Sequence, residues 1–444
     1  MSMTPVDAKT IWFFRQRRKQ LAKSMGKGAI ALIPAAKTQW RNHDNPYPFR
    51  QSSDFFYLSG FAEPDALLVV AAKGIAGKKH QSVLFTHPND PEHARWEGAR
   101  MGVDRACKIL GVDQAFALDE QDEQLFTLLS RAERVYLPFD DDDLLAQTLD
   151  IIRQLRQKAR AGVTAPRALL DVKELIAEQR LIKDELEIKQ LRRAAQVSAQ
   201  GHNAVLKALP KAKTESELAA ELIATFTRAG GECAFPSIVA GGSNACVLHY
   251  RENNQPLPKD GLVLVDAGAE VGMYAGDITR TWPVSGTFSK PQRELYELVL
   301  KAQKAAIATL KPGADFDAPH RAAVDVITRG LIKLGLLKGP VAEAIENEHY
   351  KRFFMHRTGH WLGIDVHDVG AYKSDGAWRE LKPGMVMTVE PGIYIDCDAK
   401  APARYHGIGI RIEDDVLITA DGHEVLTADV PKEIAAIEKQ RSSK

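Results

Sequence analysis

Two aspartates give the first sign of chemistry in this chain. Asp266 follows the apolar run 262–265, where an isolated carboxylate is costly to bury, and Asp277 lies beyond a turn that residues 271–273 can make. If the segment folds as a hairpin with one aspartate on each strand, the two carboxylates come side by side. Two ionised carboxylates at that distance repel each other unless a cation lies between them. The segment therefore indicates either a metal site or two unrelated aspartates, one at a strand end and one in a turn.

Two glutamates occupy similar surroundings later in the chain. Glu390 follows the apolar run 385–389, and Glu413 ends the strand-like run 408–412. A charge in such a place is costly unless it has a partner. We therefore expect both carboxylates to be partnered, and a metal ion would supply the partner.

His356 and His360 have the spacing of a zinc-binding pair on a helix, but their surroundings disfavour a helix. Gly359 and Gly363 flank the second histidine, and no glutamate follows the first one. We expect both histidines on a loop and strand instead. A single histidine in such a place is more often structural, so the argument depends on the joint occurrence of all the candidates.

The five candidate ligands are mostly hard oxygen donors. They are Asp266, Asp277, His360, Glu390 and Glu413. This set suits two divalent ions such as Mn²⁺, bridged by carboxylates, better than it suits a thiolate-rich zinc site. Two ions roughly 3.5–4 Å apart can share a hydroxide and polarise a carbonyl group. Hydrolysis of an amide near neutral pH requires that combination.

The order and surroundings of these residues resemble those of the M24 metallopeptidases, which have the pita-bread fold, and within them the aminopeptidase P group. The resemblance covers nearly the whole chain, and its motifs are specific in combination rather than singly. The matching segments are Y-P-F-R-Q-S-S-D-F-F-Y-L-S-G-F-A-E-P at 47–64, L-H-Y at 248–250, D-A-G at 266–268, G-D-I-T-R-T at 276–281, H-D-V-G at 367–370, V-E-P-G at 389–392 and G-I-R-I-E-D at 409–414.

The resemblance implies a role for each candidate ligand and two divalent metal ions as cofactors, Mn²⁺ before Co²⁺ or Zn²⁺. Asp266 would chelate one ion, while Asp277 and Glu413 would bridge the two. His360 and Glu390 would complete the site. Glu390 would also act as proton acceptor and donor beside a bridging hydroxide that attacks the scissile carbonyl.

Further residues match catalytic positions of the family. His249 and His367 match histidines that contact the substrate, stabilise the tetrahedral intermediate and orient the scissile carbonyl. His356 matches another active-site histidine, and Arg411 an arginine that supports the ligands or the substrate. Imidazoles can donate hydrogen bonds to developing oxyanion charge. Trp96 resembles a tryptophan that reaches a neighbouring subunit's active site, although its context, R-W-E-G, differs from the family pattern.

The chain departs from the family pattern at two further places. The segment 356–360 reads H-R-T-G-H instead of the usual H-G-L-(S/G)-H, which is expected to change the pocket wall beside His360. The stretch 235–246 is shorter than in some bacterial relatives, which affects the fit of the substrate's residues.

The activity implied by the resemblance is release of the N-terminal residue from peptides whose second residue is proline. The imide nitrogen of proline lacks N–H, and general peptidases handle it poorly. A prolidase restricted to Xaa-Pro dipeptides would use the same ligands and remains an alternative. A pocket closed around the dipeptide's carboxylate would favour prolidase, and an open groove would favour aminopeptidase P.

Other members of the fold family are less compatible with the sequence. Methionine aminopeptidase lacks the N-terminal domain that this chain has. Metal-free binding proteins with this fold have lost ligands, whereas all five positions are filled here. Creatinase-like hydrolysis without metal is disfavoured for the same reason.

We expect these residues to be held by a chain of two domains, because 444 residues exceed the size at which single cores stop growing. We expect a small α/β domain of aminopeptidase P type over 1–176 and an α+β pita-bread catalytic domain over 177–444. Strands are expected at 29–33, 66–71, 82–85, 134–137, 385–389 and 409–412. Helices are expected to begin at Asp184, Thr214, Ser289 and Asp317, the first three with Glu or Gln three residues later as in a capping box.

Composition and charge point to a folded, soluble protein. The chain is 45% hydrophobic and 26% charged, and its net charge of +1 disfavours nucleic-acid binding. No run has the length of a signal peptide's apolar core or of a membrane span. The four scattered cysteines predict free thiols. We therefore expect a cytoplasmic protein whose partners are peptide substrates, and the resemblance implies a homo-oligomer, either a dimer or a tetramer.

Overall fold

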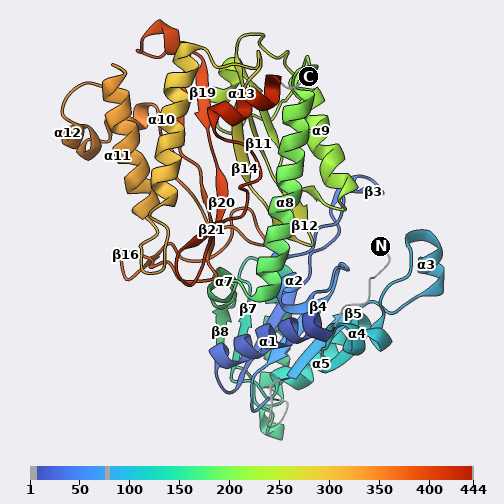
Figure 1. The fold of residues 1–444 in the computed structure, drawn as a ribbon. Coiled ribbons are helices and arrows are strands. Elements are labelled where there is room, and N and C mark those ends of the chain that lie inside the picture. Colours follow the sequence, from blue (N-terminus) through green and yellow to red (C-terminus); the bar gives the residue numbers. More distant parts are fainter. Residues whose placement is uncertain (1–7, 76–80, 443–444) are drawn as a thin grey trace. The chain divides into compact units, whose positions relative to one another are not determined.

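The computed structural model describes residues 8–75 and 81–442 (Figure 1), and the chain divides into two units, Met1–Arg180 and Leu181–Lys444. Helix α7 (Lys173–Leu181) spans the predicted boundary after residue 176. The helix belongs mostly to the first unit, because Ile176 is fully buried and Arg180 forms an ion pair of 2.7 Å with Asp54. The division therefore comes after Arg180.

The first unit is built on one mixed six-stranded sheet with the order β6-β5-β4-β1-β7-β8 (Figure 1). Strand β1 (Ala29–Pro34) pairs antiparallel with β4 (Leu67–Ala71) and parallel with β7 (Arg134–Leu137). Every residue of β4 is buried, as expected for a central strand covered on both faces. The four predicted strands of this domain are confirmed.

The remaining strands of the first unit are β2 (Trp40–Asn42), β3 (Asn45–Pro46), β5 (Gln81–Thr86), β6 (Gln114–Ala117) and β8 (Ala168–Asp171). Its other helices are α1 (Ala8–Met25), α2 (Ser53–Ser59), α3 (Pro91–Glu97), α4 (Val103–Leu110), α5 (Gln121–Leu129) and α6 (Asp142–Gln157).

The second unit combines long helices with several small antiparallel sheets (Figure 1), as predicted for an α+β domain. Its helices are α8 (Glu185–Ala208), α9 (Glu215–Arg228), α10 (Lys290–Ile307), α11 (Ala318–Lys333), α12 (Val341–Glu346) and α13 (Ile434–Ser442). Its strands are β9 (Glu232–Cys233), β10 (Ile238–Gly241), β11 (Leu262–Ala267), β12 (Ala269–Val271), β13 (Tyr274–Ala275), β14 (Ile278–Pro283), β15 (Lys373–Ser374), β16 (Ala377–Trp378), β17 (Val386–Val389), β18 (Gly392–Ile395), β19 (Ile408–Arg411), β20 (Asp414–Ile418) and β21 (His423–Val425).

The predicted helices of the second unit begin at the expected residues, but their side-chain capping differs from one helix to the next. Asp184 and its partner three residues later form a reciprocal capping box at α8. At α9 the Thr214 hydroxyl accepts from the Glu217 amide at 3.3 Å, but the Glu217 carboxylate accepts from the Lys213 amide at 2.8 Å. The predicted box at Thr214 is therefore only half formed, because the glutamate satisfies the N–H one residue earlier.

A buried histidine on α8 supports the strand that carries Asp266. His202 is completely buried, and its Nε2 lies 2.9 Å from the carbonyl oxygen of Ala267, so Nε2–H donates. Its Nδ1 has no hydrogen-bond partner among the described residues. A proton added to Nδ1 would be a buried donor without an acceptor. Burial accordingly lowers the pKa of His202 to about 4.

We expect His202→Gln to make the free energy of unfolding less sensitive to acid. An unfolded histidine has a pKa of about 6.5, so the native state binds this proton more weakly, and its stability falls as the pH drops from about 6.5 toward 4. Glutamine keeps an N–H donor but does not titrate. Between pH 7 and pH 4.5 the variant should lose about 2–3 kcal/mol less unfolding free energy than the native protein. Denaturant unfolding at both pH values measures this, with exposed His349→Gln as control. Equal losses in native protein and variant would contradict the assignment.

Candidate metal centre

The first two candidate ligands come from an antiparallel strand pair. Strand β11 pairs with β14 so that Asp266 lies opposite Thr279 and Ala267 opposite Ile278. Asp277 directly precedes β14, so it lies one residue outside the strand in which it was expected. The pairing nevertheless brings the two aspartates to neighbouring positions at one end of the pair.

The predicted turn is present, but the hairpin has an extra bend. Gly272 and Met273 adopt left-handed φ values of 59° and 72°, which link β12 and β13 in a tight hairpin. Between this hairpin and the β11–β14 pair, the chain bends at Gly268 and Gly276. A Cβ atom on Gly268 would lie 1.6 Å from the carbonyl oxygen of Gly276, so the close approach requires glycine. This bend places Asp277 directly before β14, at one end of the β11–β14 pair.

The two glutamates come from the ends of a second pair of strands. Strand β17 pairs with β20 so that Val389 lies opposite Asp414. Glu390 follows β17 and Glu413 precedes β20, so both leave this sheet at the same end. The chain continues from Glu390 into β18 and reaches Glu413 from β19, and these two strands pair with each other. The predicted strands at 385–389 and 409–412 are confirmed to within one residue.

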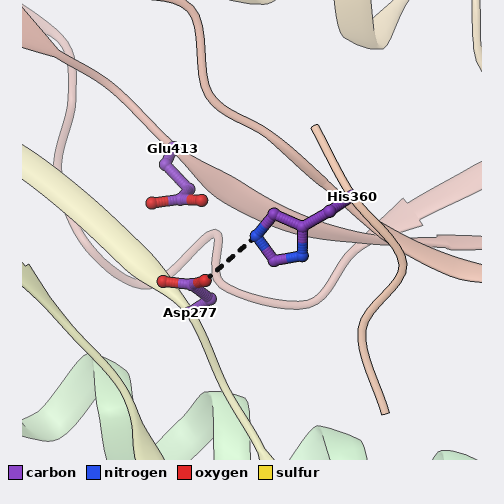
Figure 2. A group of neighbouring side chains, drawn as sticks. All are labelled: Asp277, His360 and Glu413. Atoms are coloured by element: carbon purple, nitrogen blue, oxygen red, sulfur yellow. Dashed lines mark ion pairs between the residues drawn. The ribbon is translucent and has the colours of Figure 1, made fainter. Parts of the chain in front are cut away.

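Three of the five candidate ligands converge directly. Asp277, His360 and Glu413 each offer one ligand atom, and these atoms all lie within 4.8 Å of one another (Figure 2). His360 Nε2 lies 3.4 Å from Asp277 Oδ2 and 3.7 Å from Glu390 Oε1. His360 itself lies in a loop, as predicted, rather than in a helix. Asp266 joins the other four ligands in the lining of one cavity of about 750 Å³.

The pKa shifts of these carboxylates indicate that the cluster lacks positive charge. Burial, followed by the charges of Asp266 and Asp415, raises the pKa of Asp277 well above its usual range. Burial and the charges of Asp277 and Glu390 do the same for the pKa of Glu413. In addition, Oδ1 of Asp266 is buried without a hydrogen-bond partner among the described residues. Several buried carboxylates with too little compensating positive charge fit a pair of divalent cations.

His360 is oriented as a metal-binding imidazole would be. Its Nδ1 lies 2.9 Å from the carbonyl oxygen of Trp361, so Nδ1–H donates and the Nε2 lone pair faces the carboxylates. Its ring also lies 4.4 Å from the ring of His367, nearly perpendicular to it. The donor set and this orientation together fit the predicted metal site.

All three nitrogens of the Arg411 guanidinium donate hydrogen bonds, and one of them donates to the candidate ligand Asp266. Its Nη2 donates to Asp266 Oδ2 at 2.5 Å, and its Nε donates to the hydroxyl of Thr279 at 3.0 Å. Its Nη1 donates to the hydroxyl of Tyr394 at 2.9 Å. Of the two roles that the resemblance offered for this arginine, these contacts favour support of the ligands.

The three other predicted histidines line the same cavity. His356 has both ring nitrogens engaged, with the hydroxyl of Tyr394 at 2.8 Å and the carbonyl oxygen of Arg357 at 2.7 Å. Burial and the charge of Arg411 lower the pKa of His356 to about 3. Burial, then His360 and His249, lower the pKa of His367. His356 and His367 are therefore neutral at physiological pH.

Several supporting residues were not predicted from the sequence. Tyr394 links His356 to Arg411, and nothing in its strand sequence, G-I-Y-I, marks it. Asp415 Oδ2 accepts from the backbone amide of Asp277 at 3.0 Å. The run of acidic residues E-D-D at 413–415, which lies between two apolar segments, was a signal that could have pointed to Asp415.

Comparisons with known proteins agree with this geometry. The family model "Metallopeptidase family M24" matches residues 189–420, and "Aminopeptidase P, N-terminal domain" matches residues 14–136. The chain is 43% identical over 433 residues to a Xaa-Pro aminopeptidase of Haemophilus influenzae, covering 96% of each chain. It is 42% identical over 431 residues to the Escherichia coli Xaa-Pro aminopeptidase, covering 96% of this chain and 97% of the relative.

Solved structures give the same result. A Pseudomonas aeruginosa aminopeptidase superposes with a TM-score of 0.93 at 44% identity, covering 98% of each chain. A zinc-substituted E. coli aminopeptidase P in complex with product superposes with a TM-score of 0.94 at 41% identity, covering 99% of each chain. With the ligand cluster described above, these matches establish that the chain belongs to metallopeptidase family M24, with a pita-bread catalytic domain preceded by an aminopeptidase P N-terminal domain.

Proposed function

We propose that this protein is a two-metal aminopeptidase that releases the N-terminal residue from peptides with proline in second position. The observation that carries the proposal is the convergence of Asp277, His360 and Glu413 inside a large cavity that Glu390 also lines. The relatives of similar length are named Xaa-Pro aminopeptidases, which supports the substrate class. All five ligand positions are filled, which disfavours a non-catalytic binding protein.

Two divalent ions fit the donor set described above. Asp266, Asp277, His360, Glu390 and Glu413 would hold them. When bound, such a pair supplies Lewis acidity for the scissile carbonyl and a water nucleophile that is active near neutral pH. Because most donors are carboxylate oxygens, we propose Mn²⁺ as the metal, with Co²⁺ or Zn²⁺ as alternatives.

The residues of the chain itself would move the protons and orient the substrate. Burial raises the pKa of Glu390, which suits a carboxylate that takes up a proton and then gives it to the leaving nitrogen. His249 and His367 line the cavity and would orient the carbonyl and donate to its oxygen as negative charge develops. The aromatic rings of Phe235 and Tyr372 on the cavity wall would pack against the proline ring.

Metal removal and reconstitution test the need for metal, and a comparison of two peptides separates this function from prolidase. The protein is stripped of metal, Mn²⁺ is restored, and hydrolysis of a Xaa-Pro-Yaa tripeptide is compared with hydrolysis of the matching Xaa-Pro dipeptide. We expect no activity in the stripped protein and tripeptide cleavage after reconstitution. Cleavage of the dipeptide alone would identify a prolidase with the same centre. Cleavage of neither peptide, with Mn²⁺ bound, would favour a binding protein.

We also propose a cytoplasmic homo-oligomer, a dimer or a tetramer. No helix in the ranges 8–75 and 81–442 is both long and apolar enough to cross a membrane. The four cysteines are free thiols, as predicted. Trp96 on α3 is 85% exposed, which suits a contact with another subunit. Sedimentation of the native protein and of Trp96→Ala tests this part of the proposal.

A further inference from the structure

The cavity wall carries acidic residues, which are all candidate metal ligands, and a separate set of basic residues. Its acidic residues are four of the five candidate metal ligands: Asp266, Asp277, Glu390 and Glu413. Its basic residues, histidines aside, are Arg251, Arg357, Lys373 and Arg411. With two divalent ions bound, the four carboxylates would be neutralised. The remaining charge on the wall would then be positive.

Two of the cations are held against one aromatic ring. Lys373 Nζ lies 4.4 Å from the centroid of the Trp378 ring, and the guanidinium of Arg357 lies 4.7 Å from it. Lys373 and Trp378 are direct partners in the β15–β16 hairpin, which fixes the lysine over the ring. The Trp378 ring also lies 6.1 Å from the ring of Phe316, which extends the aromatic surface along the cavity wall.

The cations differ in whether a carboxylate of the protein already forms an ion pair with them. Arg357 pairs with Asp317, and Arg411 pairs with Asp266. Lys373 and Arg251 are exposed, and no carboxylate of the described residues forms an ion pair with either. A cation–π contact leaves the ammonium able to bind an anion. Lys373 and Arg251 are therefore the cations available to a ligand.

The lysine is close in the chain to the ligand segment. The backbone amide of Trp361, the residue after His360, donates to the hydroxyl of Tyr372 at 3.3 Å. Tyr372 directly precedes Lys373, so one tyrosine side chain separates the metal ligand's loop from the lysine's backbone. In an extended peptide, the carboxylate of the residue after proline lies about 7 Å beyond the scissile carbonyl. Lys373 thus lines the same cavity as the candidate ligands and follows a tyrosine that contacts their loop.

We propose that Lys373, held on Trp378, and Arg251 form a carboxylate subsite for the residue that follows proline. The carboxylate is either the free C-terminus of a Xaa-Pro-Yaa tripeptide or an acidic side chain in a longer peptide. Arg357 positions the Trp378 ring and contributes less charge, because Asp317 already neutralises it. This inference rests on the proposed function and specifies its substrate preference.

The test compares peptides that differ only in the carboxylate. The native holoenzyme should cleave Xaa-Pro-Yaa with a higher kcat/KM when its C-terminus is free than when it is amidated, by about threefold or more. The ratio should approach one as salt is raised to about 0.5 M, because exposed charges are screened. A second pair, Xaa-Pro-Glu-amide and Xaa-Pro-Gln-amide, distinguishes a side-chain carboxylate from a terminal one.

Variants assign the preference to these residues. Lys373→Met should lower the acid-to-amide ratio, and Lys373→Met combined with Arg251→Met should abolish it. Lys373→Glu should invert it, because the new carboxylate repels the peptide's own. Lys338→Met, which removes an exposed lysine outside the cavity, should keep the native ratio. A double variant with the native acid-to-amide ratio would overturn the inference.

The outcomes also separate this inference from the proposed function. If the holoenzyme cleaves none of the peptides, free or amidated, the proposed function itself fails. If it cleaves all of them with equal acid and amide values, the function holds and the carboxylate subsite is wrong.

Discussion

Replacement of Glu390 by alanine is expected to lower kcat/KM on a Xaa-Pro-Yaa peptide by at least about a thousandfold, because in the proposed function this one side chain is both a metal ligand and the proton carrier. The fold should persist. Glu390 is half-buried beside other carboxylates, and burial and the charge of Asp266 raise its pKa, so its removal relieves repulsion in the metal-free protein. Steady-state kinetics, with circular dichroism of the same samples, measure both expectations.

Asp277→Asn should give a comparable loss of activity, because it removes the charge of a proposed metal-ligating carboxylate while keeping the shape of the side chain. Bound metal, measured by elemental analysis after gel filtration, should fall in this variant. Glu346→Ala on α12, which removes an exposed glutamate, serves as the matched control for both substitutions. Full activity in either site variant would refute the assignment of the centre.

Asp414→Asn should cause the largest loss of stability of the substitutions considered. Asp414 is fully buried, and its carboxylate accepts from Arg280 Nη2 at 2.7 Å and from Lys432 Nζ at 2.6 Å. Burial alone would raise its pKa, but the charges of Arg280 and Lys432 outweigh burial and lower the pKa to about 2. The asparagine would leave the buried Arg280 guanidinium without a counter-charge, at a cost of about 3–5 kcal/mol. Denaturant unfolding at pH 7 measures this cost.

The comparison for this prediction is an ion pair at the surface. Arg192 and Glu424 lie 2.6 Å apart, with half-exposed side chains. Glu424→Gln should therefore cost less than about 1 kcal/mol, because water already solvates both partners. A loss of similar size for Glu424→Gln and Asp414→Asn would show that burial does not set the cost.

Features that depend on local chemistry could be predicted from the sequence alone. Strands such as β4 and β7 are short apolar runs, and α8 begins where Asp184 and Glu187 satisfy each other's backbone amides. The candidate ligands were predictable because a carboxylate such as Asp266 in an apolar run is too costly to leave without a partner. Glycine residues also excluded a helix around His360.

The tertiary structure decided which distant side chains share the site. Arg411 and Asp266 are 145 residues apart in the chain, yet the guanidinium holds the carboxylate at 2.5 Å. Tyr394 joins His356 to Arg411, although its own strand is uniformly buried. No local pattern encodes such contacts, because each depends on the pairing of strands and loops that lie far apart in sequence.

The placement of Lys373 follows the same rule. As a residue type it is one lysine among many on the surface, and nothing in its local sequence singles it out. The role we propose for it depends on the β15–β16 pairing that holds it over Trp378, and on the contact of Arg357 with the same ring. Residue types and spacing thus indicated the chemistry of the centre, whereas the cations on the rest of the cavity wall come together only in the folded chain.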